Sequence, residues 1–362
     1  MRIRRPVGIV LLNSPAGLVL YDSGTLKQWD GEIIATESIA SLLTYCNKWL
    51  DKNLVIRYLT LLINCDEDTA KKIIMELLDA GILIQENQSL QKHFETQEVI
   101  WRNYGWEDPF LFHLHTNQLP KMDYKTDPKG FEDKALMEKY LKIEKLPDNY
   151  KEMNTRIQIY LPKNPQVKQQ KLTEVFTDWV GSARYSGPLS LDEFSWITYL
   201  GYGQTANRRL PITGNHVAKT SPSGGSRHPT EVYPIVLSVD GLIPGLYHYN
   251  VKNHSLELLR ENFYEEFVKK HIITHPSRPA FKPTVVYLYT TIFERSMYRY
   301  REPRSYRVMN YDLGHLMQTT AYLASAINRS SYRGYSLHDS ILDDFLDIDG
   351  IYESVMSFTI IG

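Results

Sequence analysis

The clearest pattern of apolar and polar positions lies between residues 66 and 80. Ala70, Ile73, Ile74, Leu77 and Leu78 recur at steps of three and four residues, which is the spacing of one apolar face of a helix. We expect Asp68 or Thr69 to cap this helix at its start. Gly81 is expected to end it, with a strand following at residues 82–84.

Residues 1–95 together predict a winged-helix-like domain. A strand near residues 7–12, an amphipathic helix at 38–49 and an apolar helix at 54–62 precede the helix at 66–80, and 82–84 would form the wing. Such a domain can bind a peptide by adding a strand to its edge, can pack against another domain or form a dimer, or can bind DNA. Few basic residues lie on these helices, which argues against DNA.

Residues 96–175 predict a connecting region rather than a free linker, because several aromatic residues lie between Trp101 and Phe112. His113 and His115 alternate with apolar residues, so both would face one side of a strand. No carboxylate or thiol cluster accompanies them, and we therefore expect no metal site. The charged stretch 121–150 predicts a surface helix.

The last part of the chain, residues 176–362, mixes strand and helix patterns. Residues 231–239 are rich in β-branched and aromatic types and predict a strand. Ser190 and Glu193 have the spacing of a capping box, so a helix is expected to begin there. A further helix from Asp312 has an apolar face that we expect to enter the core, formed by Leu313, Leu316, Met317, Thr320, Leu323, Ala324 and Ile327.

Composition excludes several classes of protein. The 362 residues carry a formal net charge of −1, which does not favour a protein that coats nucleic acid or anionic lipid. No apolar run is long enough to predict a membrane span, and the apolar stretch after Arg5 is too short for a signal peptide. Cys46 and Cys65 make no disulfide framework, as expected for a cytoplasmic protein.

One loop has the composition of a ligand-binding segment. Residues 221–230 read Ser-Pro-Ser-Gly-Gly-Ser-Arg-His-Pro-Thr, immediately before the strand at 231–239. Adjacent glycines let a backbone approach a flat ligand and direct amides toward it, and Arg227 and His228 supply charge and donors. A plain Gly/Ser turn between strands is the alternative.

Three ordered motifs resemble one family. The loop PSGGSRHPTEVYPIV followed by GLYHYN, the sequence YDLGHLMQ at 311–318, and the ending from Phe345 to Gly362 are similar to SagB-type dehydrogenases, a nitroreductase-like family that includes azoline oxidases. The matches span roughly residues 175–362. The resemblance implies an α+β nitroreductase-like fold, an FMN cofactor and a homodimer with each flavin between two chains.

The resemblance also implies which residues bind the flavin. Ser223, Gly224, Gly225 and Arg227 match the loop that lies against the isoalloxazine ring. Gln318 lies on the matching helix, and Arg333 and Gly334 match a segment that helps to bind phosphate. Ser182 and Arg184 stand near the family's Arg-x-Ser-x-Arg motif, but the earlier arginine is absent here and Arg184 is one place out of register.

The segment 295–311 is expected to carry the chemistry. It contains five arginines and four tyrosines, and related azoline oxidases have a Lys-Tyr pair where this chain has Arg299 and Tyr300. Arginine stays protonated in proteins, so Arg299 is a poor base. Either Tyr300 removes the proton, or Arg299 only positions a carbonyl or carboxylate, or the chain catalyses another flavin reaction.

These observations lead to one main hypothesis and two alternatives. The main hypothesis is an FMN-dependent dehydrogenase of a ribosomally made peptide, oxidising azoline to azole or a related C–H bond with dioxygen as acceptor. Its partners would be the leader segment of a precursor peptide, a cyclase and a second copy of the chain, without nucleic acid or membrane. The alternatives are a reductase or dehydrogenase of another small molecule, and a flavin-less scaffold that presents peptide to a cyclase.

Overall fold

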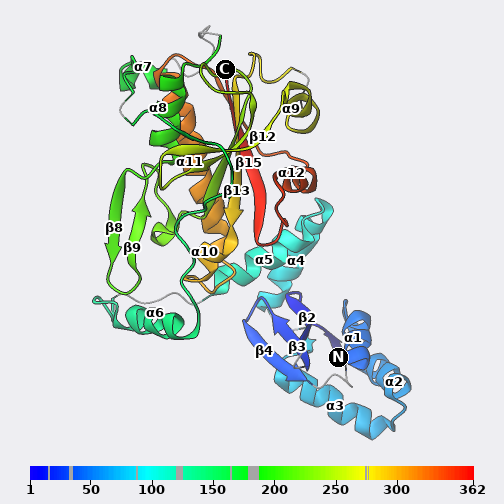
Figure 1. Cartoon of the computed structure of the whole chain (residues 1–362). Coiled ribbons are helices and arrows are strands. Elements are labelled where there is room, and N and C mark those ends of the chain that lie inside the picture. Colours follow the sequence, from blue (N-terminus) through cyan, green and yellow to red (C-terminus); the bar gives the residue numbers. More distant parts are fainter. Residues whose placement is uncertain are drawn as a thin grey trace. The chain divides into compact units, whose positions relative to one another are not determined.

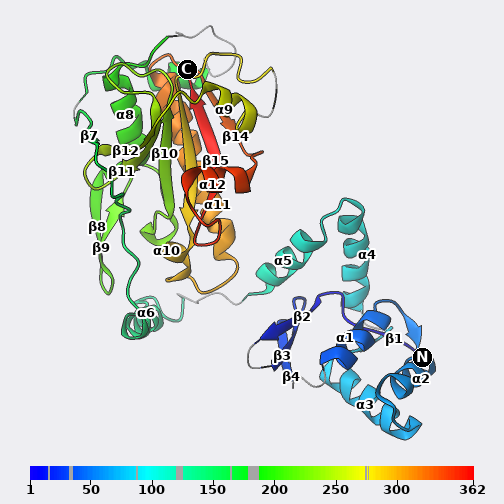
Figure 2. The ribbon, with the colours of Figure 1, turned by 45° about the vertical axis from the view of Figure 1, so that its right-hand side comes forward.

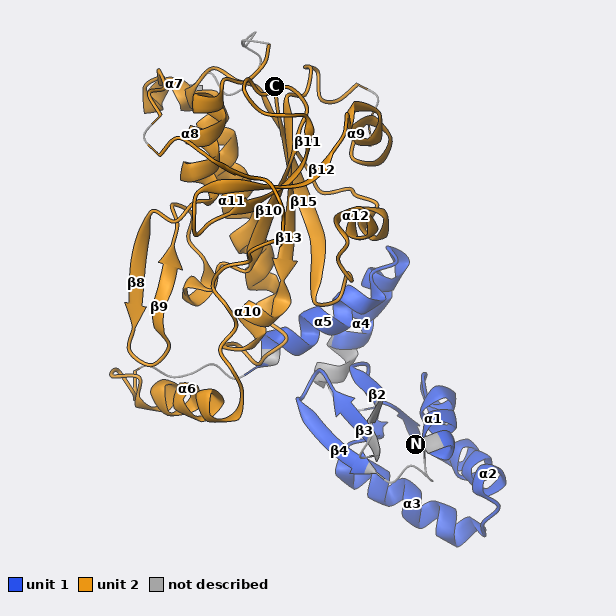
Figure 3. Cartoon of the chain, viewed as in Figure 1, with its two compact units in different colours: residues 1–123 blue, residues 124–362 orange. Residues whose placement is uncertain are grey.

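The structure is a computed structural model of the 362-residue chain. It describes residues 1–14, 17–31, 36–86, 89–119, 125–163, 165–177, 187–273, 275 and 277–362. The chain forms two compact units, residues 1–123 and 124–362 (Figure 3). The three segments expected from the sequence, divided at residues 95 and 175, stay a prediction.

The first unit combines two small antiparallel sheets with helices. One sheet has the order β5-β1-β6 and the other β2-β3-β4. The strands are β1 (Arg2–Arg4), β2 (Ile9–Ser14), β3 (Gly17–Asp22), β4 (Lys27–Gly31), β5 (Leu50–Asp51) and β6 (Ile84–Gln85). The helices are α1 (Thr36–Tyr45), α2 (Lys52–Ile63), α3 (Glu67–Ala80), α4 (Ser89–Asn103) and α5 (Glu107–Gln118). Helices α1 to α3 and the β5-β1-β6 sheet belong to this unit, and the winged-helix-like assignment of residues 1–95 stays a prediction.

Helix α3 ends where the sequence predicts and begins slightly earlier than its predicted cap. Gly81 closes it with φ +83°, a conformation that glycine adopts without strain. The cap is Asp66, whose carboxylate accepts from the amide of Thr69 at 2.8 Å. The predicted caps Asp68 and Thr69 are therefore wrong, because both lie inside the first turn. Ala70 and Ile74 are fully buried, as the apolar pattern indicates.

The expected strand around His113 and His115 is also wrong. Both residues lie in helix α5, where positions two apart point to different sides. His115 packs edge-on against Tyr21 at 4.8 Å between ring centroids, whereas His113 is exposed. Leu114 is buried in one cluster with Phe110, four residues earlier, which is the spacing of a helix face and not of a strand.

The second unit is built on a seven-stranded antiparallel sheet of order β14-β15-β13-β10-β11-β12-β7, with β8 and β9 as a separate hairpin. Its strands are β7 (Gln158–Tyr160), β8 (Ala206–Leu210), β9 (Gly214–Ala218), β10 (Thr230–Val236), β11 (Gly245–Asn250), β12 (Ser255–Glu261), β13 (Val285–Ile292), β14 (Ser331–Gly334) and β15 (Glu353–Ile361). Its helices are α6 (Phe131–Ile143), α7 (Leu172–Thr177), α8 (Leu191–Tyr202), α9 (Glu265–His271), α10 (Phe293–Met297), α11 (Ser305–Ala326) and α12 (Asp339–Leu346), with a 3₁₀ turn η2 at Gly224–Ser226.

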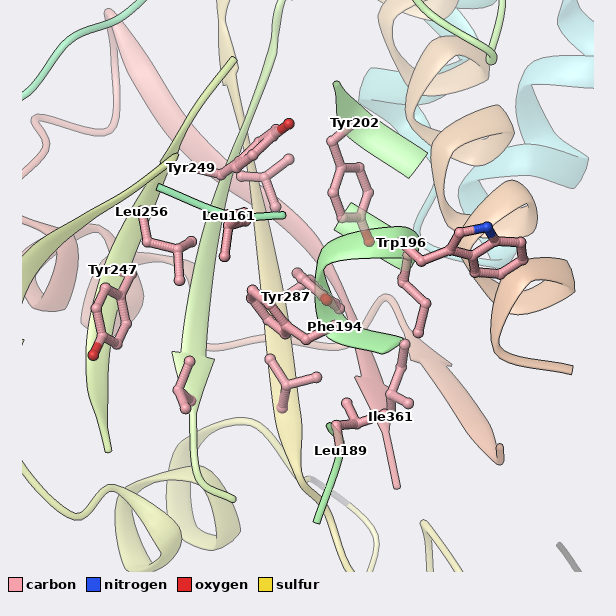
Figure 4. Packing of buried hydrophobic residues seen from close by; sticks show 14 of the residues in the cluster. Leu161, Leu189, Phe194, Trp196, Tyr202, Tyr247, Tyr249, Leu256, Tyr287 and Ile361 are labelled. Atoms are coloured by element: carbon pink, nitrogen blue, oxygen red, sulfur yellow. The ribbon is translucent and has the colours of Figure 1, made fainter. Parts of the chain in front are cut away.

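Helices cover both faces of this sheet, as Figures 1 and 2 show for α8 and α11 on one side and α9 and α12 on the other. The larger core lies under α8 and α11. There Phe194 and Tyr202 of α8 pack on Tyr287 of β13, and Tyr249 of β11 lies nearby (Figure 4). The predicted apolar face of α11 enters this core, since Leu313, Leu316 and Met317 are buried. The α+β class expected for this unit is confirmed.

Local signals in the sequence fix the start of α8. Ser190 accepts from the amide of Glu193 at 3.1 Å, and the Glu193 carboxylate accepts from the amide of Ser190 at 2.9 Å, which is the predicted capping box.

Within the described residues, no helix is both long and apolar enough to cross a membrane.

A buried chain of charges links three strands of the sheet. His248 on β11 contacts Glu231 on β10 at 3.0 Å through Nε2 and Glu257 on β12 at 2.7 Å through Nδ1. Burial alone would lower the pKa of His248, but the two carboxylates raise it. Burial opposes the charge of Glu231, yet Arg295 at 2.5 Å and His248 outweigh it and lower the pKa of that carboxyl to about 2.

This network predicts an acid-sensitive stability. A folded-state pKa below the ordinary value of 4.5 means that Glu231 stabilises the fold above about pH 4.5, and that this contribution is lost as the pH falls toward about 2. Glu231→Gln is therefore expected to lower the free energy of unfolding by about 3 kcal/mol at pH 7, because it leaves buried charges unpaired. The difference from the unsubstituted protein should shrink as the pH falls below 4.5.

Urea denaturation of both proteins across this pH range measures the effect. Glu261→Gln is the matched control, since Glu261 is an exposed carboxylate at the end of β12 in the same sheet. A difference for Glu231→Gln that stays constant with pH, or one no larger than that of Glu261→Gln, would contradict the charge network.

Candidate functional site

The glycine-containing loop lies between β9 and β10 and is tightly folded. Gly225, Ser226 and His228 all have positive φ, at +58°, +54° and +43°. Two backbone bonds close the turn, from the amide of Ser226 to Ser223 O at 3.0 Å and from the amide of Arg227 to Gly224 O at 3.2 Å. Positive φ at two non-glycine residues costs energy, and such strain is typical of segments that contact ligands.

The Asp312 carboxylate holds this loop on helix α11. Its oxygens accept from Ser223 Oγ at 2.6 Å and from the Gly224 amide at 3.1 Å. Ser223 Oγ in turn accepts from the His228 amide at 2.9 Å. Burial raises the pKa of Asp312, and these donors oppose that rise. The motif match drew attention to the helix that contains Asp312, but sequence reasoning missed this role.

Gly225 lies against the side chain of Tyr300. A Cβ atom at Gly225 would come within 2.4 Å of the Tyr300 hydroxyl oxygen, so this glycine is required both by the backbone and by the contact. Strand pairing explains the meeting, because Thr230 at the start of β10 lies opposite Thr291 near the end of β13. The loop before β10 and the segment after β13 therefore lie at the same end of the sheet.

Arg227 points into the protein rather than into solvent. It is 7% exposed, and its Nε atom is buried without a hydrogen-bond partner among the described residues. Burial lowers the pKa of Arg227, and Arg299 adds to this while Tyr300 and Tyr298 oppose it. The Tyr298 hydroxyl is likewise buried and unpartnered in the described part of the chain. Arg227 Nε and the Tyr298 hydroxyl are therefore two buried polar groups that a bound molecule could satisfy.

A carboxylate of helix α6 pairs with Arg299. Arg299 forms a salt bridge with Asp133, and its guanidinium lies 5.0 Å from the ring centroid of Tyr300. The neighbouring Arg301 pairs with Glu144 and stacks on Tyr140 at 3.7 Å. Helix α6 therefore covers the segment 298–301, an arrangement that the charged sequence of 121–150 did not indicate.

Gln318 and Arg333 come together at a second point on α11. Arg333 Nη1 donates to Gln318 Oε1 at 2.7 Å, and both line a cavity of about 620 Å³ with Phe176, Tyr322 and Tyr335. Gly334 is explained by packing, since a Cβ there would come within 2.0 Å of the Phe358 ring. Ser182 and Arg184 lie outside the described residues.

Helix α11 thus connects two clusters of predicted site residues. The loop residues Ser223 and Gly224 meet it at Asp312, and Arg333 meets it at Gln318. Six residues of α-helix separate the two points by about 9 Å along the axis.

The antiparallel sheet with helices on both faces has the α+β, nitroreductase-like fold. No family model matches the chain. It is 32% identical over 253 residues to the trifolitoxin-processing protein TfxB of Rhizobium leguminosarum bv. trifolii, covering 68% of each chain. It is 27% identical over 190 residues to a nitroreductase-type protein of Methanocaldococcus jannaschii, covering 51% of this chain and 88% of the relative.

Among solved structures, a nitroreductase-type protein of Anabaena variabilis matches with a TM-score of 0.47 and 20% identity. The match covers 63% of this chain and 46% of the Anabaena chain, so the chain spans less than half the length of that protein. The relationship to TfxB and the motifs place the chain plainly: it belongs to the SagB-type, azoline oxidase-like family of the nitroreductase-like superfamily.

The contact between Gly225 and Tyr300 predicts the effect of one added methyl group. Gly225→Ala should lower the free energy of unfolding by roughly 3 kcal/mol. A left-handed residue costs about 1–2 kcal/mol by itself, and the loss is expected to be larger because Tyr300 must also move. Gly241→Ala is the matched control. Gly241 has φ +78°, but nothing lies within 4 Å of its added Cβ.

Thermal or urea unfolding of both variants separates steric contact from backbone strain. Adding Tyr300→Phe to Gly225→Ala removes the hydroxyl that the methyl group would meet, and should restore part of the lost stability. Equal losses for Gly225→Ala and Gly241→Ala would show that Tyr300 does not lie against the loop.

Proposed function

We propose that the chain is an FMN-dependent dehydrogenase that oxidises a C–H bond in a ribosomally made peptide, with azoline-to-azole oxidation as the first candidate and dioxygen as acceptor. The observation that carries this proposal is the buried, unpartnered Nε of Arg227 beside the Gly225–Tyr300 contact. The name of the relative TfxB, a trifolitoxin-processing protein, supports a peptide substrate.

The residues present fit an FMN cofactor. The strained loop at Ser223, Gly224 and Gly225 would lie against the ring, with Arg227 as a donor to its polar edge. The phosphate would lie at the cavity of Gln318 and Arg333, where a guanidinium suits a dianion. When bound, the flavin supplies a two-electron hydride acceptor.

In this proposal Tyr300 contacts the substrate where the flavin ring meets it. Its hydroxyl lies at Gly225, and the ring is oriented by the guanidinium of Arg299, which Asp133 holds in turn. Arg299 keeps its charge and orients Tyr300 rather than taking a proton.

A second copy of the chain is proposed to complete the site. Tyr311 on α11 is 61% exposed, and nothing lies within 4 Å of a Cβ placed at Gly314 on the same helix. An exposed aromatic residue beside a glycine on a helix permits close packing against another helix.

The first unit is proposed to hold the leader segment of the precursor peptide. Strand β4 pairs only with β3 among the described strands, so its outer edge can accept an added strand. A cyclase that makes the azoline would supply the substrate. The free thiols Cys46 and Cys65 agree with a reducing compartment such as the cytoplasm.

Turnover of an azoline peptide by the purified full-length protein tests the function. Tyr300→Phe is expected to lower kcat by about 100-fold or more while flavin content stays unchanged, because it removes the hydroxyl and keeps the ring. Tyr160→Phe is the control, since Tyr160 is 66% exposed on β7. A substrate with its leader removed should raise KM more than it lowers kcat.

Near-normal turnover of Tyr300→Phe would remove Tyr300 from the mechanism. Flavin reduction by a nicotinamide with no reaction of azoline peptides would instead identify a reductase.

A further inference from the structure

A lysine that no motif singled out lies beside the glycine-containing loop. Lys219 directly follows β9 and lines a small cavity of about 10 Å³. The other lining residues come from the loop and from α11, and include Ser223, His228, Thr230 and Asp312. No hydrogen bond or ion pair reaches the Lys219 amine from any residue that the structure describes.

The charges around Lys219 stabilise its ammonium form only in part. Glu231, whose charge favours the ammonium form, is already paired with Arg295 at 2.5 Å and with His248 at 3.0 Å. Burial lowers the pKa of Lys219 to about 8, with Arg295 adding to the effect and Glu231 opposing it. Asp312 also faces the cavity, but it accepts from Ser223 and Gly224.

Other groups in this part of the site are poor proton acceptors near neutral pH. Arg299 is permanently charged. Burial lowers the pKa of His228 to about 3 and that of His216 to about 4, with nearby cations adding to both shifts. A general base works best when its pKa lies near the pH at which the enzyme operates.

Lys219 shares the cavity with a second polar side chain. The Thr230 hydroxyl is buried, lines the same cavity, and has no partner among the described residues. A space of this volume is about the smallest that holds one water molecule, which could bond both Thr230 and Lys219. Such a water would relay a proton between the loop and the amine.

We propose that Lys219 is the proton acceptor of this site, taking over the role that Arg299 cannot perform. The inference rests on the proposed function. One substrate carbon loses its hydrogen as hydride to the flavin, the neighbouring carbon loses a proton to the Lys219 amine, and a double bond forms between the two carbons. Dioxygen then takes two electrons and two protons to give hydrogen peroxide, and the Lys219 ammonium returns its proton in that half of the cycle.

The pKa of Lys219 can be measured without turnover. Competitive labelling of the flavin-loaded, full-length protein with acetic anhydride between pH 6 and 11, followed by peptide mass spectrometry, reports the pKa of each lysine. Lys219 is expected to titrate near 8, whereas an exposed lysine titrates near 10.4. A value near 10 for Lys219 would overturn the proposal.

Two variants test the role in turnover. Lys219→Arg keeps a charge that cannot be removed, and Lys219→Met removes it, so both should lower kcat by about 100-fold or more while flavin is retained. In the unsubstituted protein kcat/KM should rise with pH through about 8, and Lys219→Arg should abolish that rise. Lys168→Arg, at an exposed position, is the matched control.

Normal turnover of Lys219→Arg with an unchanged pH profile would overturn the assignment. If Lys219→Met fails to fold, Lys219→Arg and the labelling experiment still decide the question. If the unsubstituted protein does not oxidise azoline peptides, the proposed function fails. A Lys219 pKa near 10 in the same preparation would separately refute the role proposed for Lys219.

Discussion

One buried carboxylate determines the geometry of the proposed site. Asp312 takes the Ser223 hydroxyl and the Gly224 amide, and so fixes a strained loop to the longest described helix of the second unit. Burying a carboxylate is unfavourable unless donors satisfy it. Because the loop supplies those donors, the loop and the helix stabilise each other in one arrangement, and the positions of Gly225 and Arg227 follow from it.

The sheet brings the remaining parts to this point. The antiparallel pairing of β10 with β13 places the loop next to the segment 298–301, although the two are far apart in the sequence. Helix α11 then extends from the loop to Arg333 on β14, the edge strand beside β15. A rigid helix and a buried sheet are suited to holding a ligand at two ends, because neither can shift without disturbing the core.

Much of this could be predicted from local sequence. The capping box of Ser190, the end of α3 at Gly81 and the apolar face of α11 depend on short-range spacing, and the sequence predicts them correctly. The strand expected at His113 fails because apolar alternation over a few residues also suits a helix. Predicted site residues such as Gln318 and Arg333 do lie together, but Gly334 has a sufficient explanation in its contact with Phe358.

The contacts that the sequence could not indicate are those between distant segments. Nothing in the stretch around Asp133 indicates that it pairs with Arg299, and nothing near Lys219 shows that Glu231 is already occupied by Arg295 and His248. Such pairings depend on the tertiary fold. They also change the chemistry. The pairing with Asp133 fixes Arg299, and the pairing of Glu231 with Arg295 and His248 leaves Lys219 without a carboxylate of its own among the described residues.

The most direct test of the account is whether the purified full-length protein binds FMN at the loop held by Asp312. The account predicts that the protein carries FMN or takes it up with a change in the flavin absorption spectrum, and that Asp312→Ala weakens this binding. A protein that gives no spectral change with excess FMN, or an Asp312→Ala variant that is folded and binds FMN as tightly as the unsubstituted protein, would contradict it.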